Sequence, residues 1–241
     1  MTYILLLPFA LAPSLIWLAF FLRKDTHPEP NRMILKVFLL GMLVTIPAIY
    51  IETFLEGFLS SFSLPRIGYL FLYFLAGIAL VEELLKYLVV RFGVFSNSAL
   101  DEPVDVMLYM IIAGLGFAAF ENILLLFRLI QTYPVTDIFL VNTVRFVQAV
   151  FLHALVSGLF GYFLAFSLVR SRTSNMKKSG FKQQGFLFFF GFFSATILHG
   201  LFNFYIFYIG GQSFFLLLLP VIPLAAIAVF ISFGFRQLKN L

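Results

Sequence analysis

The chain has 241 residues, of which 62% are hydrophobic, 19% are aromatic and only 11% are charged. A soluble domain is about 25% charged and about half apolar. A core of this length cannot hide the excess of apolar side chains, so lipid must solvate much of it. The absence of cysteine excludes disulfides and thiolate chemistry. The net charge of +5 comes from short tracts at the ends of apolar runs, which is typical of a membrane protein's cytoplasmic face and argues against nucleic-acid binding.

Seven apolar stretches are long enough to cross a bilayer, which needs about 20 residues. They are 3–22, 33–55, 67–90, 104–127, 138–169, 185–207 and 213–233. The first lacks a small-residue cleavage site and is interpreted as a retained anchor. The fifth is too long for a simple crossing, so we expect it to start at the interface or to be strongly tilted. The sequence thus predicts an all-α polytopic helical bundle of about seven transmembrane helices, in one domain over 1–241 with its chemical motifs within 67–207.

The basic residues predict how the chain lies in the membrane. If seven helices alternate, thirteen of the 16 lysines and arginines fall on one side, five of them in 170–182. The other side keeps only Arg66, Arg128 and Arg145. Because basic residues concentrate in cytoplasmic connections, the N-terminus is expected outside and the C-terminus in the cytoplasm, with 170–182 against anionic lipid.

Five ionisable side chains lie deep in the apolar runs, where a charge is most costly. They are Glu82, Glu83, Glu121, His153 and His199, and they come from four different spans. A charge at the membrane centre costs roughly 2.5–3.5 kcal/mol on insertion scales. We therefore expect these groups to face one another inside the bundle in contact with water, which favours a functional site over structural polar contacts.

Helical spacing adds supporting residues to this set. Glu82 and Lys86 are four residues apart and can pair on one face, while Glu83 points roughly 100° away. Asn203 follows His199 by four residues, and an amide one turn from an imidazole can fix its tautomer. Asn122 alone is interpreted as a hydrogen-bonding bridge between helices. Small residues on the fourth and fifth spans predict close helix packing at this depth.

Carboxylates and imidazoles limit the chemistry. The sequence has no HExxH motif and no convincing serine with a base, so a general base that activates water remains. Two histidines and a glutamate could also bind zinc, with another glutamate as the base. The residues do not choose between these mechanisms. A proton-coupled transporter or channel also uses midplane carboxylates, although no inverted repeat is evident, and a non-catalytic scaffold is a third alternative.

These motifs, in this order and over most of the chain, resemble the PrsW family of intramembrane proteases, within the CAAX-type membrane peptidases. The resemblance rests on Glu82-Glu83-x-x-Lys86, Asp101-Glu102-Pro103-x-Asp105 with Tyr109, Gly116-Phe117-x-x-x-Glu121-Asn122, Arg145 before His153, His199-x-x-x-Asn203, and the stretch from Asp25 to Glu29-Pro30.

The resemblance implies a membrane-embedded peptidase that cleaves membrane proteins or lipidated peptides, an anti-sigma factor being one such substrate. It implies Glu82 or Glu83 as the base that activates water, and His153 and His199 as partners of an oxyanion or a metal. Glu121 stands where many CAAX-type peptidases carry histidine. Both a zinc-dependent and a metal-free glutamate mechanism are compatible with this set.

Two further polar residues have expected local roles. Asp105 could be the N-cap of the fourth span, or it could gate substrate entry with Asp101 and Glu102 at the cytoplasmic mouth. Arg145 is expected to pair with Glu52 or Glu56, or to extend its side chain to the membrane interface.

Overall fold

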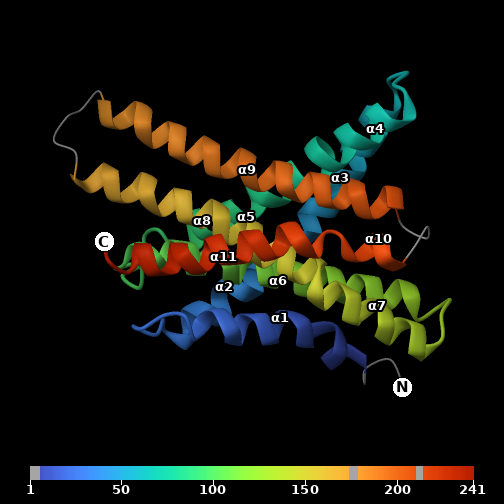
Figure 1. The fold of residues 1–241 in the computed structure, drawn as a ribbon, viewed down its shortest axis with the longest axis horizontal. Coiled ribbons are helices and arrows are strands. Elements are labelled where there is room, and N and C mark those ends of the chain that lie inside the picture. Colours follow the sequence, from blue (N-terminus) through green and yellow to red (C-terminus); the bar gives the residue numbers. More distant parts are fainter. Residues whose placement is uncertain (1–5, 174–178, 210–213) are drawn as a thin grey trace.

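The computed structural model describes residues 6–173, 179–209 and 214–241, and within these ranges the chain forms helices and no strand. The expected starts of the first and seventh spans, at 3 and 213, lie outside the described residues, as do the side chains of 170–182. The helices, shown in Figure 1, are α1 (Leu7–Leu22), α2 (Asn31–Leu43), α3 (Thr45–Ser60), α4 (Arg66–Leu72), η2 (Tyr73–Ala79), α5 (Leu80–Gly93), α6 (Pro103–Leu129), α7 (Val135–Val147), α8 (Ala149–Thr173), α9 (Ser179–Ile209), α10 (Phe214–Leu218) and α11 (Val221–Leu238).

Six helical segments of the described chain are long and apolar enough to cross a membrane. They are Asn31–Ser60, Arg66–Gly93, Pro103–Leu129, Val135–Val169, Gln183–Ile209 and Leu216–Leu238. The apolar helix α1 has 16 described residues and is shorter than these. The predicted all-α, multi-pass architecture is therefore confirmed, whereas a total of seven crossings stays a prediction.

The fifth expected span is two helices and not one tilted rod. It breaks at Gln148, which ends α7 with φ −116° and ψ −72°. The side chain of Gln148 donates to the carbonyl of Leu217 at 2.6 Å, which holds the break against the chain just before α11. A hydrogen-bonding side chain at a helix break compensates for lost backbone contacts in lipid. The break lets α8 enter the bundle at its own angle, five residues before His153.

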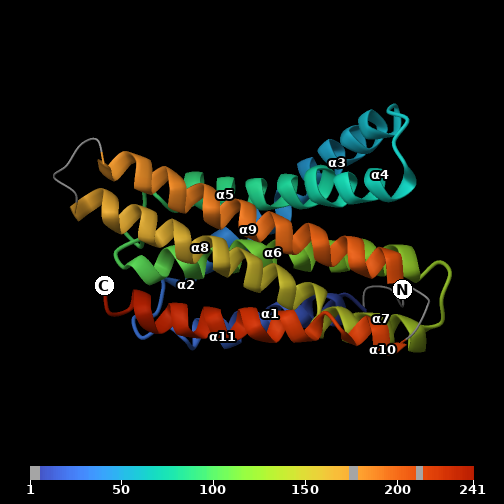
Figure 2. The ribbon, with the colours of Figure 1, turned by 45° about the horizontal axis from the view of Figure 1, so that its top comes forward.

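Helix α6 forms the centre of the bundle and packs against α8, α2 and α1. Its residues from Val104 to Ala119 are buried throughout. Figures 1 and 2 show α6 surrounded by other helices, with the connections α1–α2 and α5–α6 at the same end of the molecule as the last residue of α11. The α3–α4 and α6–α7 connections lie at the opposite end.

Two glycines bring the helices of the polar groups close together: Gly114, on a span where small residues predicted close packing, and Gly200, which that prediction did not include. A Cβ atom on Gly114 of α6 would lie 2.9 Å from the backbone oxygen of His153 on α8. A Cβ on Gly200 of α9 would lie 2.9 Å from the Cα of Leu75 in η2. Only glycine permits such backbone approaches, so these two contacts set the depth at which His153 and His199 enter the bundle.

Candidate active site

Five buried side chains from α5, α8 and α9 meet at the centre of the bundle. Glu82, Glu83, Lys86, His153 and His199 are each no more than 3% exposed. The π-helix η2 ends at Ala79, three residues before Glu82. Such turns are frequent at functional sites, because they re-aim the residues that follow. The expected convergence of the two glutamates and the two histidines is present in the structure.

Lys86 is the hub of this cluster. Its Nζ donates to Glu82 Oε2 at 3.1 Å and to Glu83 Oε1 at 2.7 Å. It also lies 2.9 Å from His153 Nδ1. An ammonium has three N–H donors and no acceptor, so all three are used. The ring of Phe117 lies beneath the same nitrogen, with its centroid 4.6 Å away.

The contact with Lys86 fixes the tautomer of His153. Because the ammonium can only donate, His153 Nδ1 must accept, and the proton of the neutral ring is on Nε2. That nitrogen lies 2.9 Å from Glu121 Oε2, which accepts the hydrogen bond. The imidazole therefore links the central cluster to Glu121, and both of its nitrogens are engaged.

His199 orients Glu83 from the opposite side. Its Nδ1 lies 2.9 Å from Glu83 Oε1, the oxygen that also accepts from Lys86. Its Nε2 is 3.8 Å from Glu82 Oε2. The second oxygen of Glu83, Oε2, is buried and has no hydrogen-bond partner among the described residues. One oxygen of this carboxylate is thus held by two donors while the other is left to accept a proton.

Glu121 lies at the rim, with a side chain that is 29% exposed. Arg145 of α7 approaches it at 3.6 Å and donates more closely, at 2.6 Å, to Asn122 Oδ1. The expected pairing of Arg145 with Glu52 or Glu56 is wrong, because its guanidinium contacts Glu121 and Asn122 of α6 instead.

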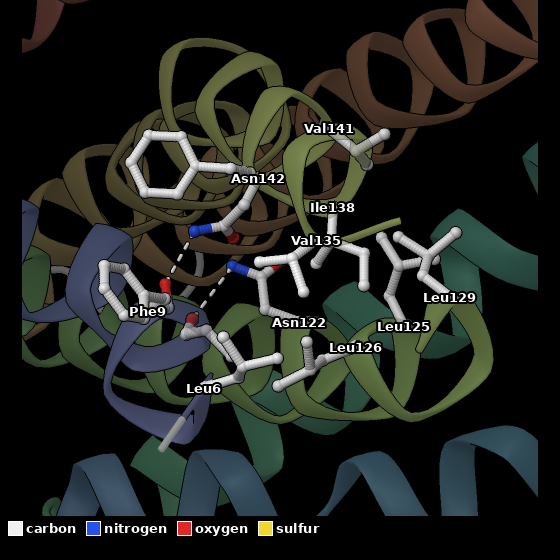
Figure 3. Close-up of a pocket in the computed structure, with 12 residues that line it drawn as sticks. Leu6, Phe9, Asn122, Leu125, Leu126, Leu129, Val135, Ile138, Val141 and Asn142 are labelled. Atoms are coloured by element: carbon white, nitrogen blue, oxygen red, sulfur yellow. Dashed lines mark hydrogen bonds between the residues drawn. The ribbon is translucent and has the colours of Figure 1, made fainter. Parts of the chain in front are cut away.

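Asn122 bridges helices, as its sequence context indicated. Its Nδ2 donates to the carbonyl of Ala10 at 3.3 Å, while its oxygen accepts from Arg145. Figure 3 shows Asn122 and Asn142 reaching the backbone of α1 side by side, beside a small apolar cavity of about 30 Å³. That cavity is too small and too apolar for chemistry, so this end of α6 is an anchor for α1.

Two other supporting residues lie outside the contacts of the cluster. Asn203 is half-buried one turn after His199. Within the described part of the chain, no hydrogen bond joins these two side chains. Asp105 lies at the start of α6, where its Oδ2 accepts from the backbone of Asp101 and Glu102 at 3.1 and 2.7 Å. The expectation that Asp105 is the N-cap residue is wrong: Glu102 is the N-cap, and Asp105 completes the capping box from the third helical position.

Asp105 belongs to a second acidic group, which we call the mouth cluster: Asp25, Glu29 and Asp105. Tyr109, which is fully buried, donates to Glu29 Oε2 at 2.5 Å. Burial raises the pKa of Glu29 above its usual range, the Tyr109 hydrogen bond acting in the opposite direction. The sequence motifs include these residues, but their spacing predicts no contact between Glu29 and Tyr109.

The central cluster offers a donor set that suits zinc. Glu82, Glu83, His153 and His199 each supply one ligand atom, and these atoms lie within 4.8 Å of one another. Imidazole nitrogens and carboxylate oxygens are ordinary zinc ligands. The set fits in type and spacing, but Lys86 occupies part of the same space and would have to withdraw its ammonium for a metal to enter.

The fold and this cluster define a class: a multi-pass helical membrane protein with acids and imidazoles in contact at the centre of its bundle. Comparison with known proteins narrows the class. Residues 29–233 match a family model described as the PrsW family intramembrane metalloprotease. Proteins named Protease PrsW are similar: that of Oceanobacillus iheyensis is 31% identical over 215 residues, covering 89% of this chain and 87% of that protein.

The Bacillus subtilis protein of this name is 32% identical over 155 residues, covering 64% of this chain and 65% of the other. The Geobacillus kaustophilus protein is 37% identical over 118 residues, with 48% and 49% covered. No solved structure matches the chain. The chain belongs to the PrsW family and is a membrane-embedded peptidase of the cell membrane.

Proposed function

We propose that the chain hydrolyses peptide bonds of membrane-associated proteins, with water activated by Glu83. The observation that carries this assignment is the unequal environment of the two Glu83 oxygens. Lys86 and His199 hold Oε1 at 2.7 and 2.9 Å, while Oε2 has no partner among the described residues. A carboxylate held in this way is oriented before the water arrives, and general-base catalysis of this kind contributes typically 10²–10⁴-fold.

The neighbouring groups have complementary roles. Glu83 Oε2 takes a proton from water as the water oxygen attacks the peptide carbonyl, and returns it to the leaving amine. The positive charge of Lys86 favours the negative charge that develops on the carbonyl oxygen. Glu82 accepts a second hydrogen bond from Lys86 and helps to hold the ammonium in place. His153 links Lys86 to Glu121 through its two ring nitrogens.

A zinc ion in this family would be held by His153, His199 and one of the two glutamates, and would polarise the substrate carbonyl and bound water. With zinc bound, Lys86 would withdraw its ammonium from this space, whereas Glu83 would still need an oriented oxygen to act as the base.

The substrates in this proposal are membrane proteins or lipidated peptides, anti-sigma-factor-like proteins among them. The chain crosses the bilayer seven times, α1 included, with its N-terminus outside. The basic connections support this orientation, because the α1–α2 and α5–α6 connections share one end of the bundle with the end of α11 (Figures 1 and 2).

Cleavage by purified protein in lipid vesicles tests the proposal. Wild type should cut a single-span membrane protein, and Glu83→Gln should lower the rate by at least about 10²-fold. Glu56→Gln is the matched control, because Glu56 is an exposed glutamate on α3, and it should cut like wild type. Unchanged cleavage by Glu83→Gln would remove the assignment. Loss of activity with a chelator and its return with zinc would separate the zinc-dependent from the metal-free mechanism.

A further inference from the structure

A polar cavity of about 220 Å³ lies beside the central cluster, between α3, α6 and α7. It is lined by Thr45, Ile49, Glu52, Phe117, Glu121, Leu124, Leu125, Arg128 and Arg145. We call it the α3–α6–α7 cavity. Two of its lining residues contact the cluster directly, since Glu121 accepts from His153 and Phe117 lies beneath Lys86. The cavity therefore borders the site on the side where α6 ends.

Glu52 is the unexplained group in this cavity. Its Oε1 is buried and has no hydrogen-bond partner among the described residues. A buried acceptor without a partner costs about 1–3 kcal/mol, and more when it is charged. An apolar side chain at this position would avoid that cost, so the carboxylate indicates a ligand that supplies a donor.

Arg128 provides the opposite kind of group. It is exposed at the end of α6, lines the same cavity, and forms no ion pair with the residues that the structure describes. Arg145, by contrast, is committed to Asn122 and Glu121. The cavity thus presents one acceptor, Glu52, and one uncommitted set of donors, Arg128, beside the proposed catalytic groups.

Peptide backbone is the ligand with this chemistry. Before a transmembrane segment can be cut its helix must unwind, and each freed N–H and C=O group costs several kcal/mol in lipid unless it is paired. We propose, on the basis of the proposed function, that the α3–α6–α7 cavity binds the unwound substrate backbone next to the cleaved bond. Glu52 accepts a peptide N–H, and Arg128 donates to a peptide carbonyl.

A second cavity, of about 400 Å³, is less suited to this task. It lies between α8, α9 and α11 and is lined by apolar side chains and prolines, including Leu201 and Ile227. Such a surface can hold a lipid chain or an intact helix, but it offers almost no partner for freed peptide groups. Binding of the unwound segment there is the alternative that the test must detect.

The absence of native cysteine allows a direct test in vesicles. Single cysteines replace Ile49 or Leu124 in the α3–α6–α7 cavity, and Leu201 or Ile227 in the apolar cavity, in the Glu83→Gln background. A hydrophilic maleimide should label the first pair at least about tenfold faster than the second pair. A single-span peptide that wild type cleaves should slow labelling of the first pair only. Equal labelling, or protection of Leu201→Cys alone, would overturn the proposal.

Kinetics then test the two polar residues. Glu52→Gln and Arg128→Gln should each raise KM about tenfold and change kcat less than about threefold, because they bind backbone without joining the chemistry. Glu56→Gln on α3 and Arg66→Gln on α4 are exposed controls outside the cavity. Glu52→Asp should recover part of the loss, which a folding defect would not do. An unchanged KM, or a loss confined to kcat, would overturn the assignment.

The two proposals fail in different ways. If wild type cuts no single-span protein, the proposed function fails, and the maleimide still reports whether the α3–α6–α7 cavity is open to water. If wild type cuts but neither the protection nor the KM values respond, only the backbone-binding role fails.

Discussion

The central cluster and the mouth cluster both bring acidic side chains together, but they compensate for the negative charge in different ways. Both place carboxylates close enough to share a cation. At the centre, the buried ammonium of Lys86 balances Glu82 and Glu83 through two hydrogen bonds. At the mouth, the cluster of Asp25, Glu29 and Asp105 contains no cation, and burial instead raises the pKa of Glu29.

This difference separates reactive from structural acids. Lys86 offsets one of the two central carboxylate charges, and in the proposed mechanism Glu83 stays charged and takes a proton from water. At the mouth, Glu29 is bonded to Tyr109, and Asp105 accepts from the backbone at the start of α6. These acids connect the start of α2 to α6, and their role is structural. Their buried charge is unfavourable and takes no part in the proposed chemistry.

Removing the central cation should have the largest effect. Lys86→Met leaves two fully buried carboxylates without their counter-charge, and breaking a buried ion pair costs about 3–5 kcal/mol. We expect loss of cleavage together with a clear drop in thermal stability in detergent. Lys36→Met is a control, because Lys36 is exposed and bonds only the carbonyl of Gly93. A Lys86→Met protein as stable as wild type would show that the central acids do not depend on this charge.

A glycine change should weaken the centre without removing a charge. A Cβ on Gly200 would press on the backbone of Leu75 and separate α9 from η2, which moves His199 away from Glu83. Misplacement of about 1 Å can cost about 10²-fold in rate, so Gly200→Ala should cut about 10–100-fold more slowly. Gly185→Ala on the same helix has open space around its Cβ and should be neutral. Equal rates for both variants would contradict the close-packing argument.

The sequence predicted the central cluster better than the connections between its parts. Glu82, Glu83, His153 and His199 stood out because charge in an apolar run is costly wherever the helix lies. The break at Gln148 could not be foreseen, since no proline or glycine marks it and its compensating contact is the distant carbonyl of Leu217. The partners of Arg145 were missed because they lie on α6, and spacing along one helix does not predict contacts between two helices.

The contact between Lys86 and His153 and the proposed backbone-binding role of Glu52 both depend on packing between helices. Sequence spacing could pair Lys86 with Glu82 on one helix, but His153 comes from α8, 67 residues away. Glu52 is an isolated glutamate in the second apolar stretch, and that position was the one signal that could have drawn attention to it.

At the mouth, loss of one hydroxyl should affect stability and spare activity. Tyr109→Phe removes the hydroxyl that donates to Glu29 and leaves a buried carboxylate poorly paired. This should lower the free energy of unfolding by about 1–3 kcal/mol. For a domain of this size each kcal/mol lowers Tm by about 2–4 °C. Cleavage measured well below Tm should stay within about twofold of wild type. Tyr133→Phe, at an exposed tyrosine, should change neither value. A large loss of activity in folded Tyr109→Phe would place the mouth cluster in the catalytic machinery.

The smallest expected effect is a change in the pH dependence of stability. Burial raises the pKa of Glu29 above the usual 4.5, so the folded protein holds this proton more tightly than the unfolded chain does. Its contribution to stability is therefore complete below that usual value and is lost as pH rises through the raised folded pKa. The Tm of Glu29→Gln should therefore fall less steeply with rising pH than the Tm of wild type.

The sign of this change is what separates the two clusters. If a nearby cation balanced Glu29, as Lys86 balances Glu83, the folded protein would favour the charged carboxylate. Wild type would then gain stability as pH rises, and Glu29→Gln would become less stable relative to wild type. The opposite change is expected at the mouth, where the amide introduced by Glu29→Gln removes a buried charge and keeps an oxygen that can accept from Tyr109. The Glu56→Gln variant, at an exposed position, should follow the wild-type pH curve. Parallel curves of Glu29→Gln and wild type would show that folding does not shift the pKa of Glu29, and a steeper fall for the variant would show that a cation balances this carboxylate.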